Sequence, residues 1–204
     1  MKKDFLKKIL AASLAAVMSI GCSEAVLADV IKIDLDEFVG NSRKYKQNFT
    51  YVDLKGVANR GFTDEAAGDG VGGWSDQGPT NDMSCFNTYG IQTYYGINFN
   101  IINPKENDKK SCLMMRGRGD NYVPTDVTIP VNATARGVYF LHTSPWGANK
   151  MAHVGNYTIV YSDGTEEVVD LIDGETVFNW WGSSSSDKAT SVWTGNNESS
   201  AVNL

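Results

Sequence analysis

Residues 137–163 constrain the fold more than any other stretch, because they hold two strand-like runs and lead into a tight turn. Residues 138–142 are apolar and rich in aromatic and β-branched side chains, and residues 157–161 alternate large and small side chains. The turn contains Asp163-Gly164, a pair that readily adopts the positive φ angles of tight hairpins. A third alternating run, 166–171, follows at once. Three strands without a helical period predict an antiparallel meander at the centre of an all-β sandwich.

The rest of the chain also reads as strands and loops. Strand patterns occur at 29–35, 49–54, 96–102, 111–116, 127–131 and 177–181, with final pieces at 191–193 and 201–204. Residues 55–96 show no period and are rich in Gly, Asp, Asn and Ser. A stretch of that length is either functional or ordered by something else, such as a metal. With no internal repeat and no linker, the sequence predicts one domain of low helical content.

The first 28 residues have the pattern of a secretory signal peptide. Four lysines precede an apolar run at 9–20, and small residues lead up to Ala28. We therefore expect a signal peptide at 1–28, an N-terminal lead-in at 29–47 and the sandwich domain at 48–204. The alternative is a lipoprotein cleaved before Cys22 and anchored to the membrane there, although Ser19 stands where a lipobox usually has a large aliphatic residue.

The charge of the exported chain disfavours polyanionic partners. Removing residues 1–28 takes four of the 18 basic residues and two of the 24 acidic ones, which leaves a net charge of −8. Phosphate backbones and anionic membrane surfaces bind basic patches, so the sequence predicts neither nucleic acid nor a membrane surface as a partner.

Two cysteines, Cys85 and Cys112, remain in the predicted mature chain. An even pair is typical of an oxidising compartment. A bridge between them would stabilise the fold by about 3 kcal/mol. Two separate buried thiols are the alternative, since sequence cannot place the two Cα atoms within reach of each other.

Several motifs, taken in order, resemble secreted bacterial carbohydrate-active proteins. The first is GGWSDQG at 72–78, with Asn81-Asp82 after it. The others are Gly96, Ile97, Phe99 and Ile101; Phe140-Leu141-His142 with Trp146; Tyr157-Thr158 with the turn at 161–164; Trp180-Trp181; and Trp193-Thr194-Gly195-Asn196. In this order the motifs resemble the galactose-binding-domain-like β-sandwich modules.

The resemblance covers residues 48–204 and implies an antiparallel jelly roll that binds a polysaccharide or glycan beside a catalytic domain or within a surface complex. Similar modules continue with one or two more strands after the segment that resembles 193–196. This chain stops at Leu204 in strand-like sequence. We therefore expect a C-terminally truncated sandwich that lacks its last strand or strands, with an unpaired sheet edge or an exposed apolar groove near its N-terminal strand.

Tryptophan is the candidate sugar-binding residue, because an indole ring buries a large area at a small entropic cost. The five rings lie beside polar residues at predicted strand ends or in loops. Alternatively, they fill the ends of the core. Of the neighbours Trp180 and Trp181, one should point inward and one outward. The predicted ligand-binding residues are Trp74, Asp76, Gln77, Trp146, Trp180 and Trp181.

Acidic residues crowd the long glycine-rich loop. Asp64, Asp69, Asp76 and Asp82 offer the hard oxygen ligands that Ca²⁺ accepts, which makes a structural calcium the candidate cofactor. No EF-hand spacing is present, and solvated acids in a long loop are the alternative.

No sequence motif marks a catalytic centre. His142 ends a predicted central strand, where a structural role is the simpler interpretation. The leading hypothesis is a secreted, non-catalytic carbohydrate-binding module. The alternatives are a structural or protein-interaction sandwich of an extracellular protein, and a small jelly-roll glycosidase or lyase, which would need two carboxylates facing one cleft.

Overall fold

The computed structural model describes residues 49–116, 123–135, 137–144, 151–182 and 184–200, together with the backbone of two short strands at 12–14 and 29–30. Within these residues the chain forms strands and loops, and its only helical pieces are two 3₁₀ turns, η1 (Pro79–Asn81) and η2 (Pro104–Glu106). This confirms the predicted all-β class. None of the helical pieces described is long and apolar enough to cross a bilayer.

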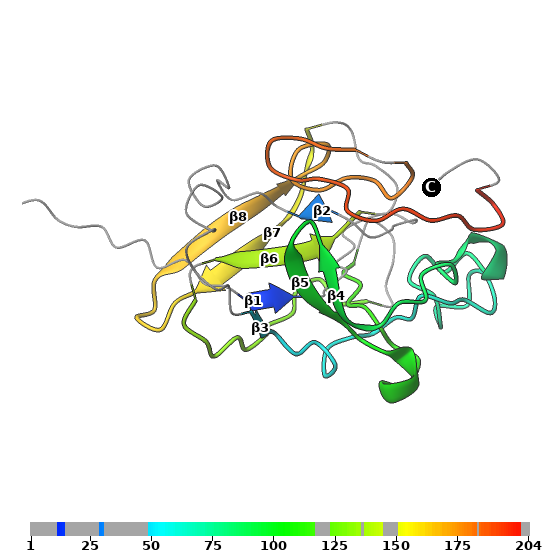
Figure 1. Cartoon of the computed structure of the whole chain (residues 1–204), viewed down its shortest axis with the longest axis horizontal. Helices are drawn as coiled ribbons and strands as arrows, with labels where there is room; N and C mark the ends of the chain where they lie inside the picture. The colour runs from blue at the N-terminus through cyan, green and yellow to red at the C-terminus, as the bar shows by residue number, and fades with distance from the viewer. Residues whose placement is uncertain are drawn as a thin grey trace, which may run out of the picture.

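The strands form one mixed sheet and two hairpins (Figure 1). The mixed sheet has the order β2-β6-β1-β3. Its strands are β2 (Asp29–Val30), β6 (Val138–His142), β1 (Ala12–Leu14) and β3 (Thr50–Tyr51). β6 pairs antiparallel with β2 and parallel with β1. One hairpin joins β4 (Gly90–Tyr94) to β5 (Ile97–Ile101), and the other joins β7 (His153–Val160) to β8 (Glu166–Ile172).

β6 is buried along its whole length because its two faces belong to two different cores. Successive side chains of a strand point to opposite faces. Tyr139 and Leu141 accordingly join a first core that also contains β5 side chains, whereas Val138 and Phe140 join a second core with side chains of β7 and β8. A strand with an apolar side chain at every position is expected where both faces are covered.

The predicted three-stranded meander is wrong in its pairing. Among the described strands, β7 pairs with β8 alone, and β6 belongs to another sheet. Phe140 of β6 instead stacks face to face on Tyr157 of β7, with ring centroids 3.9 Å apart. Contact between β6 and the second hairpin is therefore made through side chains. The predicted turn is confirmed, since Gly164 has φ 81° and Tyr161 N–H donates to Thr165 O.

Other strand predictions are only partly confirmed. β5 and β8 match their predicted ranges closely, while 49–54 is reduced to β3 and 111–116 to a single bridge between Arg60 and Cys112. Residues 127–131 join no ladder, although Val127, Ile129 and Val131 pack against the second core. The sequence patterns did not predict β4. The last piece, 201–204, lies outside the described residues, as do all but 12–14 of the predicted signal peptide, Cys22 included.

The structure describes three residues that the sequence singled out for a structural role, namely His142, Cys85 and Cys112. His142 is fully buried, its Nδ1 lies 2.8 Å from the Tyr157 hydroxyl and its Nε2 lies 3.1 Å from Thr176 O. Burial lowers the pKa of His142 to about 4. Cys85 and Cys112 are both free thiols, so the two separate thiols that the sequence left open are what the structure contains.

Candidate functional site

The long loop at 55–89 holds the predicted acidic residues, and side chains from the same loop fix it to the first core. Phe62, Trp74, Met83 and Phe86 are all buried there. Trp74 N–H donates to Gly61 O, and Met83 N–H donates to Phe62 O. The last described residues run alongside this loop, since Ser199 N–H donates to Thr80 O (Figure 1). Apolar anchors separated by irregular backbone explain why no period is visible in this sequence.

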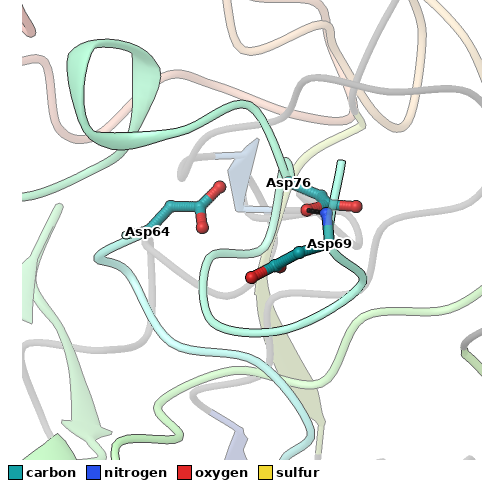
Figure 2. Close-up of side chains that lie close together, drawn as sticks. All are labelled: Asp64, Asp69 and Asp76. Carbon is teal, nitrogen blue, oxygen red and sulfur yellow. Dashed lines mark hydrogen bonds between the residues drawn. The ribbon is translucent and has the colours of Figure 1, made fainter. Parts of the chain in front are cut away.

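Three of the four predicted metal ligands lie around one turn of the loop. Asp64, Asp69 and Asp76 each offer a carboxylate oxygen, and these oxygens lie within 4.8 Å of one another. Figure 2 shows the three side chains around the loop backbone, with Asp69 and Asp76 adjacent and Asp64 on the preceding segment. Asp64 is buried, Asp76 is half-buried and Asp69 is exposed. The fourth predicted ligand, Asp82, is not part of this cluster.

The three carboxylates bind the loop's own backbone. Asp76 accepts from Asp69 N–H and Gly70 N–H, each at 3.1 Å. Asp64 accepts from Gly78 N–H at 2.7 Å and from Ala66 N–H at 3.4 Å, and Asp69 accepts from Val71 N–H at 2.8 Å. Asp82 acts similarly, accepting from Asp64 N–H and Ser84 N–H. The acids therefore order the loop directly, without requiring the metal that the sequence suggested as one way to order it.

The cluster is nevertheless compatible with a hard cation. Each carboxylate oxygen has two lone pairs, so an oxygen that accepts one N–H can still bind a metal. Ca²⁺ binds oxygens at 2.3–2.6 Å, a range that oxygens within 4.8 Å of one another can satisfy. None of the ion pairs found among the described residues involves these three acids. Asp64, Asp69 and Asp76 are thus the residues that would hold calcium.

The tryptophans nearest this loop form a continuous set of rings. Trp74 and Trp180 are 1% and 3% exposed and meet edge to face, with centroids 5.5 Å apart and planes at 90°. Trp181 stacks on Trp180 with centroids 4.7 Å apart and planes at 15°, and it is 43% exposed. The expectation that one of Trp180 and Trp181 points inward is confirmed. Trp74 and Trp180 therefore support the exposed ring instead of presenting a face of their own.

The remaining predicted ligand residues fall into different settings. Gln77 is half-buried, and its side-chain oxygen accepts from the Asn81 amide. Asp76 is half-buried, and its carboxylate accepts from Asp69 N–H and Gly70 N–H, as described above. Trp193, which was not a predicted ligand, is half-buried and packs edge to face on Phe86. Trp146 lies outside the described residues. Only Trp181 therefore combines an exposed ring with a fixed orientation among the predicted residues that the structure describes.

The described residues also form a groove beside β3, and the residues that line it were not among the predicted site residues. The groove has a volume of about 570 Å³ and lies between residues 51–55 and the end of the first hairpin where Gly90 pairs with Ile101. Its lining includes Tyr51, Tyr89 and Asn100. The only sequence signal was the alternation of 51–55, which we interpreted as a strand and not as a groove wall.

Comparison of the chain with family models, with curated proteins and with solved structures gives no match in any of the three.

Proposed function

We propose that this protein is a secreted, non-catalytic carbohydrate-binding module of the galactose-binding-domain-like jelly-roll type, and that Trp181 is its principal sugar contact. The observation that carries the proposal is the stacking of an exposed Trp181 on a buried Trp180. Sugars present flat apolar C–H faces, and a large aromatic ring fixed at the surface offers the matching surface.

The support beneath Trp181 favours binding over simple exposure. Trp180 and Trp74 both belong to the first core and meet edge to face, so the exposed ring rests on a buried and packed one. The backbone N–H of Trp181 donates to the Asn179 side chain at 3.2 Å, which fixes the chain at the ring's attachment point. A ring that is ordered before binding loses little conformational entropy when a ligand arrives.

The rest of the proposal concerns the setting of the module. The predicted leader at 1–28 supports export, and the net charge of −8 after its removal favours neutral glycans over anionic polymers. The described residues form strands and loops with only two short 3₁₀ turns, and this strand-rich character supports the jelly-roll proposal. The proposed partners are a polysaccharide and either a catalytic domain or a surface complex. The module would hold that second partner close to the polysaccharide.

The proposal is tested by Trp181→Ala on a panel of soluble neutral polysaccharides in affinity gel electrophoresis. We expect at least a fivefold loss of retention on whichever glycan retards the wild-type chain. Tyr95→Ala is the matched control, because Tyr95 is an exposed aromatic residue at 66% exposure in the β4–β5 turn. Equal retention of wild type and Trp181→Ala would reject Trp181 as the principal sugar contact. If no glycan retained the wild type, the carbohydrate-binding function itself would be rejected.

A protein-interaction module is the second candidate, and one observation favours it. Val160 and Val168 are 63% and 56% exposed on the outer face of the second hairpin. Because Thr158 pairs with Val168, Val160 is a diagonal neighbour of Val168 on that face. Val160→Lys with Val168→Lys should disrupt a partner complex and leave glycan retention unchanged.

A further inference from the structure

The groove beside Tyr51 lies where the two cores meet. Val52 and Leu54 belong to the second core, as does Ile102, whereas Ile101 belongs to the first. Along 51–55 the buried Val52 and Leu54 alternate with the exposed Asp53 and Lys55. The segment therefore directs apolar side chains into the protein and polar ones to the rim of the groove.

Aromatic rings and amide groups lie along the same groove. Tyr51 and Tyr89 are both half-buried, and Tyr89 packs against the first core. Asn100 is exposed on β5, while Asn103 is held in place by accepting from Lys105 N–H and donating to Glu106. A sugar ring needs an aromatic face for its C–H groups and side-chain donors and acceptors for its hydroxyls. Both are present at this groove.

The charges at the rim select the kind of sugar. Lys55 Nζ lies 3.9 Å from Glu106, so these two charges offset each other. Among the described residues that line the groove, Asp53 is the charge without an ion-pair partner, and its carboxylate is oriented by accepting from Lys55 N–H at 2.9 Å. A net negative rim repels uronic acids and sulfated or phosphorylated sugars. The groove volume of about 570 Å³ is within the range of known ligand sites.

We propose that this groove is a second saccharide-binding site, selective for neutral sugars. The proposal rests on the proposed carbohydrate-binding function and deepens it, because it adds a site distinct from Trp181 and states the charge of the ligand. Two sites on one module would raise the retention on a polymer above that on a short oligosaccharide, since the second contact becomes intramolecular.

A glycosidase cleft is the main competing interpretation, because Asp53 and Glu106 both line the groove. Both side chains are exposed to solvent, whereas the general acid of such an enzyme is held in an apolar setting that keeps it protonated. The arrangement favours binding without cleavage, and product analysis of the incubated glycan tests that difference directly.

The test uses the full 204-residue chain, labelled with ¹⁵N, titrated with neutral oligosaccharides (gluco-, xylo-, manno- and galacto-series) and with oligogalacturonate. We expect the amide signals of Gly90, Asn100 and Asn103 to shift with one neutral series and not with oligogalacturonate. Asn100→Ala with Asp53→Ala should weaken that binding at least fivefold. Both positions are exposed, so these variants should remain folded, and Tyr95→Ala is again the control.

The outcomes separate this proposal from the proposed function. If only the Trp181 signal shifts, or if the groove variants bind sugar as the wild type does, the groove is not a sugar site. Either result would leave the proposed carbohydrate-binding function intact. Groove shifts that persist in Trp181→Ala support the groove and reject only the Trp181 assignment. No shift with any sugar rejects both. Three further results would each overturn the groove proposal. They are tighter binding of oligogalacturonate than of any neutral sugar, release of shorter sugars from the glycan, and shifts of the groove signals with a random peptide mixture but not with sugars.

Discussion

Trp181 lies flat on Trp180, with ring centroids 4.7 Å apart, and Trp180 is in turn held edge to face by Trp74. The exposed ring is therefore positioned by a buried one. Trp180→Ala should lower the free energy of unfolding by about 3–5 kcal/mol, because it leaves a large cavity in the first core. Trp181→Ala should change it far less. Urea denaturation of both variants measures the difference. Equal losses would contradict the interpretation that Trp180 supports the fold and Trp181 is the exposed ring resting on it.

Asp64 should stabilise the loop through its hydrogen bonds to backbone. Asp64→Ala removes the acceptor for the buried N–H of Gly78, and an unsatisfied buried donor costs about 1–3 kcal/mol. Chemical denaturation measures the loss. Asp53→Ala is the control, because Asp53 is exposed and accepts only a local bond from Lys55. A loss at Asp64 no greater than at Asp53 would show that the loop is ordered by its apolar anchors alone.

The three-acid cluster predicts a response to calcium. Convergent carboxylates without a neighbouring cation repel one another, and a bound ion would relieve that repulsion. We expect millimolar Ca²⁺ to raise the melting temperature of the wild-type chain, since an ion that binds only the folded state stabilises it. Asp69→Asn should remove the response, because it takes away one of the three negatively charged ligands. The loop should keep its conformation, since Asp69 is exposed and the asparagine oxygen can still accept from Val71 N–H. Scanning calorimetry with Mg²⁺ as the control decides this, and an equal response of both proteins to Ca²⁺ would exclude the cluster.

His142 predicts a loss of stability in mild acid. Its pKa is about 4 in the folded protein, because burial disfavours the charged ring, and near 6.5 when unfolded. The unfolded chain therefore binds the proton first, and the stability that is present above pH 6.5 falls by about 3 kcal/mol as the pH drops to 4. His142→Gln does not titrate, so its unfolding free energy should fall less over the same range. Parallel slopes for the two proteins would contradict the assignment.

The two cysteines should react as separate thiols of very different accessibility. Cys112 is fully buried, and burial raises the pKa of its thiol to about 12, so native protein should not be labelled there. Cys85 is half-buried and should react slowly, while both thiols should react in denaturant. Mass spectrometry after alkylation checks this, with Cys85→Ser as the control. A Cys85–Cys112 bridge in the native protein would contradict the structure.

Sequence patterns predicted those parts of the fold that depend on residues close together in the chain. The alternation at 166–171 and the Asp163-Gly164 turn predicted the second hairpin because the turn and the strand next to it are contiguous in sequence. The pairing of β6 could not be predicted in this way, since its pairing partners in β1 and β2 lie more than 110 residues away along the chain. Its unbroken apolar run was the available signal that both faces are covered.

The candidate site was predictable to a similar degree. Composition identified the acids of the loop, but whether a carboxylate binds a metal or a backbone N–H depends on the path of the chain. The in-and-out placement of Trp180 and Trp181 followed from their adjacency, whereas the edge-to-face contact with Trp74 joins segments that no local pattern connects. Tyr51 and Tyr89 carried no motif and became visible only as walls of one groove.

The loop at 55–89 is shaped by its own carboxylates and by a few anchored rings. Thr63 and Val71 are exposed, and the Asp69 carboxylate holds Val71 through its backbone N–H, which any residue except proline supplies. Such a segment can diversify without refolding: selection, natural or in a display library, could rewrite its outer surface while the underlying framework stays the same.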